Sequence, residues 1–503
     1  MRQFKFAAAT LAAAVLAACG GGSSGPAVDT TLARGSLVAN PPNLVPIPQA
    51  DGTAVTKLEP TVFAQMLEAA TPGITQITGT PKCSITTYYM KYGTVGGAGE
   101  TTDATGAIMV PSGTDSACAG TRPVVLYAHG TSYDKSYNMA NLRDNHEAAL
   151  VAAMYAAQGF IVVAPNYAGY DVSKLSYHPY LNAEQSANDM IDALRAARKA
   201  FAGINAQDSG KLFVTGYSQG GHVAMATQRA MQTSYASEFK VTALAGQSGP
   251  YAMSLLGDVI VGSGKPNLGA TIFFPMISTS WQKSYGGLYA SPNEMYEDKY
   301  ATGIESLLPS LTPDTIFSSG KLPQLALFAV DSMPQAPIIP GTFGAGNLMK
   351  TSFRNAYLAD LSAHPCDVNP ADPLNCAPVN AFRKAGVKND LRNYVPNVPV
   401  LLCGGNGDPT VFWANAQATA GYFGAKGMTA PVLQVLDVDS AIGAGDPYAT
   451  VKGGFAQLKA KTAADAGGGA AGMAAVTSAY HAILVPPFCN AAARGFFQSM
   501  LAN

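Results

Sequence analysis

The stretch KLFVTGYSQG at residues 211–220 decides the fold. Its first half is a short apolar run of the kind that forms a buried strand, and small residues suited to a closely packed helix follow it. Between the two lies the pattern Gly-x-Ser-x-Gly, centred on Ser218. Glycines on both sides let the backbone turn sharply, which leaves the serine hydroxyl above the sheet. The stretch therefore predicts a strand, a tight turn and a helix, with Ser218 as a candidate nucleophile.

Strand and helix patterns alternate on both sides of this turn. Ala-rich stretches at 146–158 and 183–201 predict helices. Short apolar runs predict buried parallel strands at 124–128, 160–164, 241–245, 398–402 and 431–436. This alternation is typical of an α/β fold with a mainly parallel central sheet.

The alternation stops between residues 250 and 398, where Pro, Gly, Tyr and Met are frequent. We interpret this segment as a cap inserted between the nucleophile and the acid of the site, with side chains that line an acyl-binding surface or form an ordinary second core. A Gly/Ala-rich stretch at 463–475 is interpreted as partly loop. The predicted divisions of the body are a first core part (46–250), the cap (251–390) and a second core part (391–503).

A serine nucleophile needs a general base, because its hydroxyl is a weak nucleophile at its ordinary pKa. Three of the six histidines, His222, His364 and His481, follow Ser218 in the chain. His222 lies one helical turn beyond Ser218 and is too constrained in direction, and His364 falls in the cap. His481 follows the last predicted strand and is therefore the predicted base, the alternative being an ordinary loop histidine.

The third member of the site is an acid that orients the imidazole and stabilises its cation. Asp408 lies in a Gly-rich turn, GGNGDPTV at 404–411, directly after the strand that ends at Leu402. We predict Asp408 as this acid. Asp437 and Asp439, which follow the next strand, are the alternatives.

Two donors are expected for the oxyanion that forms when a carbonyl is attacked. One is the backbone N–H of Gln219, the residue after the nucleophile. The other is predicted at Thr131, in the sequence His129-Gly130-Thr131 that follows the strand at 124–128 and resembles the oxyanion motif of lipases and esterases. His129 is expected to orient this loop.

The N-terminus reads MRQFKFAAATLAAAVLAAC, a positive segment followed by a short apolar one. This pattern predicts a secretory signal peptide at 1–18 rather than a membrane anchor. Its end resembles the bacterial lipobox, which implies lipidation of Cys19 and, because Gly20 is not Asp, sorting to the outer membrane. The segment 19–45 that follows is rich in Gly, Ser, Pro and Asn, which predicts a flexible linker. An ordinary signal peptide that happens to precede a cysteine is the alternative.

Six cysteines remain without Cys19, and in an exported protein they are expected to form disulfides. The predicted pairs are Cys83–Cys118, Cys366–Cys376 and Cys403–Cys489, the first two from proximity in the sequence and the third because it would join the acid loop to the segment beyond the base. Free structural cysteines are the alternative. No Cys-x-x-Cys pair or Cys/His cluster has metal-ligand spacing, so no metal is predicted.

Composition excludes one class of partner. The formal net charge is −1 and charged residues make up 13% of the chain, so there is no basic field for nucleic acid. Beyond the N-terminus, no apolar run approaches the roughly 20 residues of a membrane-spanning helix. The expected membrane contact is therefore through the N-terminal lipid alone.

The motifs at 129–131, 164–170, 192–197 and 216–220 together resemble the secretory lipase branch of the α/β-hydrolases, including bacterial lipoprotein esterases. This resemblance implies hydrolysis of carboxylic esters, without metal or organic cofactor, by Ser218, Asp408 and His481. A serine peptidase on the same fold is the alternative among enzymes, although no propeller-like repeat domain favours it. A surface-binding lipoprotein on an inactive hydrolase scaffold is the alternative outside enzymes.

Overall fold

The computed structural model describes residues 32–49, 52–262, 264–330 and 341–501 of the 503-residue chain. The predicted signal peptide and Cys19 lie outside these residues.

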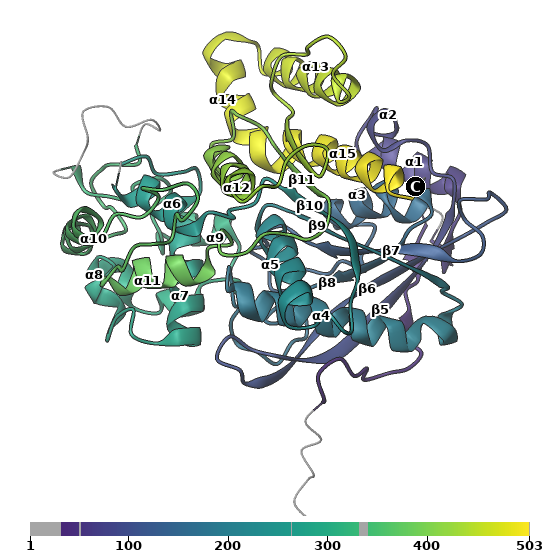
Figure 1. Ribbon diagram of the computed structural model, residues 1–503, viewed down its shortest axis with the longest axis horizontal. Helices are drawn as coiled ribbons and strands as arrows, with labels where there is room; N and C mark the ends of the chain where they lie inside the picture. Colours follow the sequence, from purple (N-terminus) through teal and green to yellow (C-terminus); the bar gives the residue numbers. More distant parts are fainter. Residues whose placement is uncertain (1–31, 50–51, 263, 331–340, 502–503) are drawn as a thin grey trace, which may run out of the picture. The chain divides into compact units, whose positions relative to one another are not determined.

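A sheet of ten strands organises the described residues (Figure 1). Its order is β1-β5-β6-β8-β7-β9-β10-β11-β12, with β4 also paired to β5. The strands from β8 to β12 are parallel, whereas β5 and β6 form an antiparallel edge. The strands of this sheet are β1 (Asn43–Leu44), β4 (Lys57–Leu58), β5 (Ser84–Val95), β6 (Thr101–Ser112), β7 (Arg122–Ala128), β8 (Ile161–Pro165), β9 (Asp208–Tyr217), β10 (Val241–Gln247), β11 (Val400–Gly404) and β12 (Leu433–Asp437), and β2 (Ile47–Pro48) pairs separately with β3 (Ala54–Val55).

Helices cover both faces of the sheet. Successive residues of its strands point to opposite sides, so both faces carry apolar side chains that the helices bury. Val124 and Leu126 of β7 pack in one core with α4, α5 and α12, and Val125 and Tyr127 pack in a second core with α1, α3 and α15. The helices are α1 (Pro60–Ala70), α2 (Thr75–Thr78), α3 (His146–Met154), α4 (Ala183–Ala200), α5 (Gln219–Thr233), α6 (Met253–Gly257), α7 (Ala270–Tyr285), α8 (Asp298–Ala301), α9 (Pro313–Ser318), α10 (Thr351–Ala363), α11 (Ala381–Asn389), α12 (Ala414–Ala425), α13 (Ala449–Asp465), α14 (Gly469–Ala479) and α15 (Val485–Ser499).

The helices between β10 and β11 gather to one side of the sheet (Figure 1) and pack around a third hydrophobic core. This core is built by α6, α7, α10 and α11, and two residues from the main body, Tyr180 and Leu181, join it. The Met and aromatic residues of this segment therefore serve first to pack a second core.

Three disulfides cross-link the described residues, in the pairs expected from the sequence: Cys83–Cys118, Cys366–Cys376 and Cys403–Cys489. The last of them joins β11 to α15 and is buried. Among the described residues, no helix combines the length and apolar character needed to cross a membrane.

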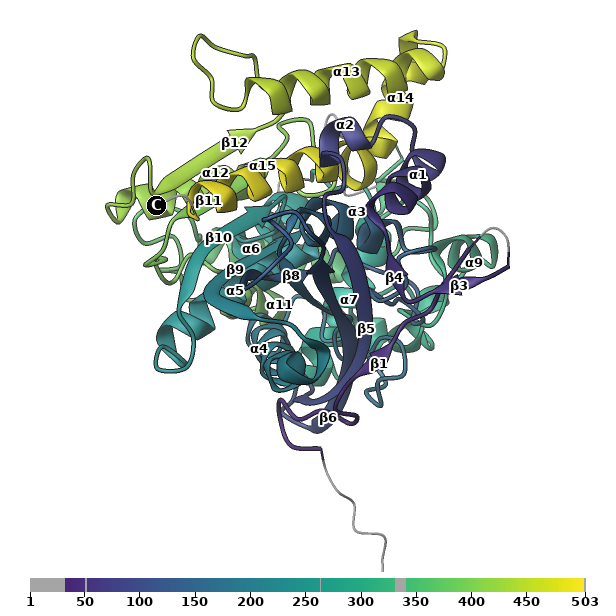
Figure 2. The ribbon, with the colours of Figure 1, turned by 90° about the vertical axis from the view of Figure 1, so that its right-hand side faces the viewer.

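One sequence-based expectation needs correction. Residues 32–45 are predicted as linker, yet Arg34 and Leu37 bridge to β5 and Asn43–Leu44 pairs with it as β1, so this part of the chain belongs to the body. The stretch 463–475, predicted to be partly loop, lies in a helical hairpin of α13 and α14 beside α15, and residues 466–468 form the loop between the two helices (Figure 2). Alanine, a strong helix former, outweighs the glycines there, and Gly467 and Gly468, with positive φ, make the turn between the helices.

Candidate active site

Ser218 stands at a strained turn between β9 and α5. Its φ of 58° lies in the left-handed region, and its N–H donates to the carbonyl of Gln247 on β10 at 2.8 Å. A Cβ on Gly220 would lie 1.9 Å from the carbonyl oxygen of Ala128, and one on Gly216 would lie 2.4 Å from the same atom. Both flanking glycines are therefore required by the close approach of the turn to the end of β7.

A histidine and a carboxylate complete a hydrogen-bonded chain with this serine. His481 Nε2 lies 2.7 Å from Ser218 Oγ, and His481 Nδ1 lies 2.6 Å from Asp408 Oδ2. The carboxylate is an acceptor, so Nδ1 carries a proton and Nε2 is free to accept one from the serine hydroxyl. The structure thus brings together the three residues predicted as nucleophile, base and acid.

The loop after β11 fixes the carboxylate of Asp408 from its other side. Asp408 Oδ1 accepts hydrogen bonds from the backbone N–H groups of Thr410 at 2.9 Å and Val411 at 3.0 Å. The side chain is almost fully buried, so these contacts set the direction in which Oδ2 faces His481. The alternative acids hold other partners: Asp437 accepts from Asn406, and Asp439 pairs with Lys459 and Tyr480.

Tyr480, which sequence reasoning missed, ties the acid loop to the segment that carries the base. Its hydroxyl accepts from the N–H of Gly407 at 3.0 Å and donates to Asp439 Oδ2 at 2.8 Å. The next residue, His481, lies in a single π-helical turn between α14 and α15, and its carbonyl accepts from the Tyr217 hydroxyl at 2.5 Å. The buried disulfide Cys403–Cys489 also joins these two parts of the chain, because Cys403 lies on β11, before the acid loop, and Cys489 lies on α15, after His481.

The two predicted oxyanion donors belong to the start of α5 and to the loop after β7. Gln219 is the first residue of α5, so its N–H has no carbonyl one turn earlier in the helix. The loop after β7 packs against the turn, since a Cβ on Gly130 would lie 3.5 Å from the carbonyl oxygen of Tyr217. Thr131 follows in this loop, and its Oγ1 bonds the hydroxyl of Tyr180 at 2.8 Å.

The loop after β7 is held by groups that the sequence did not single out. Glu147 accepts from the N–H of Gly130 at 2.9 Å and from the hydroxyl of Tyr137 at 2.7 Å. His129 is buried and stacks on Tyr167, with ring centroids 4.0 Å apart, and burial lowers its pKa. This environment fits the loop-orienting part expected of His129.

The remaining candidate histidines take other positions. His222 is buried, and its Nε2 donates to the carbonyl of Asn389 at 2.9 Å, at the junction of α5 with α11. His364 caps the end of α10, and its carbonyl accepts from Arg383. The described residues contain no group of three or more His, Cys, Asp or Glu that could hold a metal ion.

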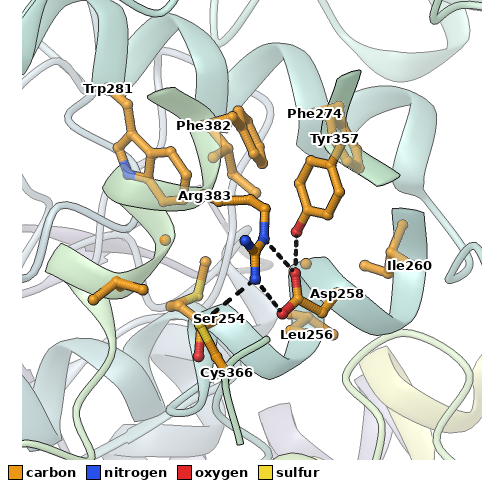
Figure 3. A pocket seen from close by; sticks show the side chains of 15 residues that line it. Ser254, Leu256, Asp258, Ile260, Phe274, Trp281, Tyr357, Cys366, Phe382 and Arg383 are labelled. Carbon is orange, nitrogen blue, oxygen red and sulfur yellow. Dashed lines mark hydrogen bonds and ion pairs between the residues drawn. The ribbon is translucent and has the colours of Figure 1, made fainter. Parts of the chain in front are cut away.

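A mostly apolar cavity lies inside the cap (Figure 3). Trp281, Phe274 and Phe382 form part of its wall, and an ion pair between Arg383 and Asp258 spans it with Nε to Oδ1 at 3.1 Å. The carboxylate also accepts from a tyrosine hydroxyl, that of Tyr357, at 2.7 Å. The buried charges are thus paired within the cap.

A known protein family and several solved structures are similar to this chain. A model of the Secretory lipase family matches residues 138–268, and no curated protein matches the chain. A structure of the rice cell wall degrading esterase LipA from Xanthomonas oryzae is 28% identical, with 80% of this chain and 91% of that chain covered and a TM-score of 0.62. A ligand-bound form of the same esterase gives 24% identity, coverage of 92% and 98%, and a TM-score of 0.68.

The chain has the α/β-hydrolase fold. The fold predicted from the sequence is confirmed, and so is the resemblance to the secretory lipase branch. A Legionella pneumophila structure shares the fold at 19% identity, with 92% of this chain and 98% of that chain covered and a TM-score of 0.64. The chain is thus similar to a lipase family and to the esterase LipA.

Buried neutral histidines give the protein a stability that depends on pH. Burial lowers the pKa of His178 to about 3 and that of His222 to about 4, because it disfavours the charged imidazolium. Unfolded histidine titrates near pH 6.5, so between about pH 4 and 6.5 the unfolded chain binds more protons than the folded one. The contribution of these histidines to the free energy of unfolding is therefore present in full above about pH 6.5 and is lost as the pH falls through that window.

Urea unfolding at about pH 7 and pH 5 should give a lower midpoint at pH 5. His222→Gln should make the pH dependence shallower, by about one proton's contribution. An unchanged slope in this variant would show that His222 does not titrate between the folded and unfolded states.

Proposed function

We propose that this α/β-hydrolase is a serine carboxylic ester hydrolase of the lipase/esterase kind, with Ser218, His481 and Asp408 as its triad. The observation that carries the proposal is the hydrogen-bonded chain from Ser218 Oγ through the imidazole to the buried carboxylate. The similarity to the Secretory lipase family and to LipA, a rice cell wall degrading esterase, supports the choice of esters as the substrate class.

In this mechanism, His481 Nε2 takes the hydroxyl proton of Ser218 as Oγ attacks the acyl carbonyl carbon. The carbonyl π electrons move to oxygen, and the backbone N–H groups of Gln219 and Thr131 stabilise that oxyanion. Asp408 stabilises the imidazolium that forms. Collapse of the tetrahedral intermediate breaks the ester C–O bond, and His481 returns the proton to the departing alkoxide, which leaves as the alcohol.

The acyl-enzyme is then hydrolysed by the reverse use of the same groups. His481 removes a proton from water, the hydroxide attacks the acyl carbon, and the Ser218–acyl bond breaks as Ser218 regains its proton. The acid is released. We assign the cap, residues 251–390, to the control of access to this site, because it is inserted between the strands that carry the nucleophile and the acid.

The test compares p-nitrophenyl esters of increasing acyl length with aminoacyl p-nitroanilides, using the same purified protein. We expect release of nitrophenol from the esters and little release of nitroaniline. Faster cleavage of the anilides would favour the peptidase alternative. Failure of a fluorophosphonate probe to label the protein would favour an inactive, surface-binding scaffold.

We also propose that the hydrolase is exported and anchored by a lipid on Cys19, in the outer membrane. The lipobox-like sequence before Cys19 and the three disulfides of the body support this. Metabolic labelling with palmitate should be lost in Cys19→Ser, and label that persists in this variant would rule out the anchor.

A further inference from the structure

A chain of buried hydrogen bonds runs behind the first turn of α5 and ends on the side chain of Gln219. Asp189 Oδ2, on α4, accepts from the N–H of Ala168 at 2.6 Å. The carbonyl of Ala168 lies 3.0 Å from His178 Nδ1, and His178 Nε2 lies 2.6 Å from Gln219 Nε2. Asp189, His178 and Gln219 are all buried, so each contact is shielded from water.

The contacts of His178 determine its tautomer. A carbonyl oxygen can only accept, so Nδ1 must carry a proton and donate to Ala168. Burial holds the ring neutral, since it lowers the pKa of His178 to about 3. Nε2 is then an acceptor, and the amide of Gln219 must turn its NH2 group towards it. Each of the three hydrogen bonds thus joins a donor to an acceptor, while Gln219 Oε1 is buried without a hydrogen-bond partner among the described residues.

The ring of His178 is also fixed by aromatic neighbours. Tyr170 and Tyr167 lie with their ring centroids 4.6 Å and 5.6 Å from that of His178. Tyr180 lies at 6.0 Å, and its hydroxyl bonds Thr131 Oγ1 at 2.8 Å. One buried cluster thus contacts both residues to which the proposed function assigns oxyanion donation.

We infer that His178 is a positioning residue for the oxyanion hole, acting through its hydrogen bond to the side chain of Gln219. The inference rests on the proposed function. The first residue of a helix lacks the hydrogen bonds that hold the interior, so the direction of its N–H depends on other contacts. The His178–Gln219 bond supplies such a contact, and small displacements of an oxyanion donor reduce its effect on the transition state.

The first test replaces Gln219 by Met, which keeps the backbone N–H and nearly the same volume but removes the side-chain donor. Gln228→Met is the matched control, because Gln228 lies on the same helix, is also 1% exposed and donates from Nε2 to a different partner, Gln232. We expect Gln219→Met to lower kcat by about 10-fold, part of the 10²–10³-fold carried by a whole oxyanion donor, with KM nearly unchanged. Gln228→Met should keep kcat. Equal kcat values for the two variants would overturn the inference.

The second test is a double-mutant cycle with His178→Phe. If His178 acts through Gln219, the two single variants should each lower kcat by a similar factor, and the double variant should fall by about the same factor rather than by their product. A product of the two effects would show that His178 acts independently and would overturn the inference. Rates are divided by the concentration of sites titrated with a fluorophosphonate, so that loss of folded protein does not count as loss of kcat.

The outcomes separate this inference from the proposed function. A wild-type protein that neither hydrolyses esters nor labels at Ser218 would overturn the proposed function itself. A wild type that does both, with Gln219→Met indistinguishable from it, would leave the triad standing and remove His178 from the machinery.

Discussion

Ser218→Ala should lower kcat for ester hydrolysis by at least about 10⁴-fold and leave the protein folded. The hydroxyl is the atom that bonds to the acyl carbon, and no neighbouring group can replace it at the end of the His481–Asp408 chain. Within the described residues, the Ser218 side chain makes one side-chain hydrogen bond, to His481. Its loss therefore removes little from the fold. At the φ of 58°, alanine is more strained than glycine but no more strained than serine, because both carry a Cβ. The substitution therefore adds no backbone strain.

The matched control is Ser248→Ala. Ser248 follows the neighbouring strand β10, has a positive φ of 43° and is buried as Ser218 is, but it lies outside the triad. Steady-state hydrolysis of a p-nitrophenyl ester and labelling by a fluorophosphonate are measured on both variants. The Ser248 variant should keep both, whereas labelling of Ser218→Ala at the wild-type rate would disprove the assignment of the nucleophile.

The parts of the site that could be predicted are those whose geometry is local. The turn at Ser218 could be predicted from the five residues of its Gly-x-Ser-x-Gly pattern. The structure adds the long-range reason for the two glycines, because a Cβ at either position would meet the backbone of β7. Asp408 and His481 could be chosen among the candidate acids and bases because the predicted fold places the end of β11 and the segment that carries His481 at the same edge of the sheet. The order of the three residues along the chain, nucleophile, acid and then base, distinguished them from the other candidates.

The residues that were missed act across long distances in sequence. His178 precedes the nucleophile, whereas the base of this fold follows it. Its partner Gln219, and Asp189, which is linked to it through Ala168, come together only when α4 and α5 pack side by side. Tyr480 reaches back to Gly407 in the same way. The pattern Tyr177-His178-Pro179-Tyr180, polar aromatic residues around a proline, was a signal that could have drawn attention to His178.

Asp408→Asn should lower kcat by about 10⁴-fold at neutral pH although the shape of the side chain hardly changes. The argument starts from the two backbone N–H groups, of Thr410 and Val411, that donate to Asp408 Oδ1. In the variant these donors select the amide oxygen, so the amide NH2 group must face His481 Nδ1. A donor at that place forces Nδ1 to become an acceptor, which moves the ring proton to Nε2. Nε2 then donates to Ser218 Oγ and cannot take the hydroxyl proton.

The contrast with Asp439→Asn makes this prediction specific to one carboxylate. Asp439 accepts from Tyr480 and pairs with Lys459, so its replacement should loosen the base segment and lower kcat by less than about 10-fold. The unfolding midpoint of both variants in urea is measured beside kcat, because a misfolded Asp408→Asn would lose activity for another reason. If Asp439→Asn were inactive and Asp408→Asn active, the acid would be the one that follows β12. Full loss in Asp408→Asn with a wild-type unfolding midpoint would instead locate the defect in the His481–Asp408 pair, through the tautomer of His481 and the lost stabilisation of its cation.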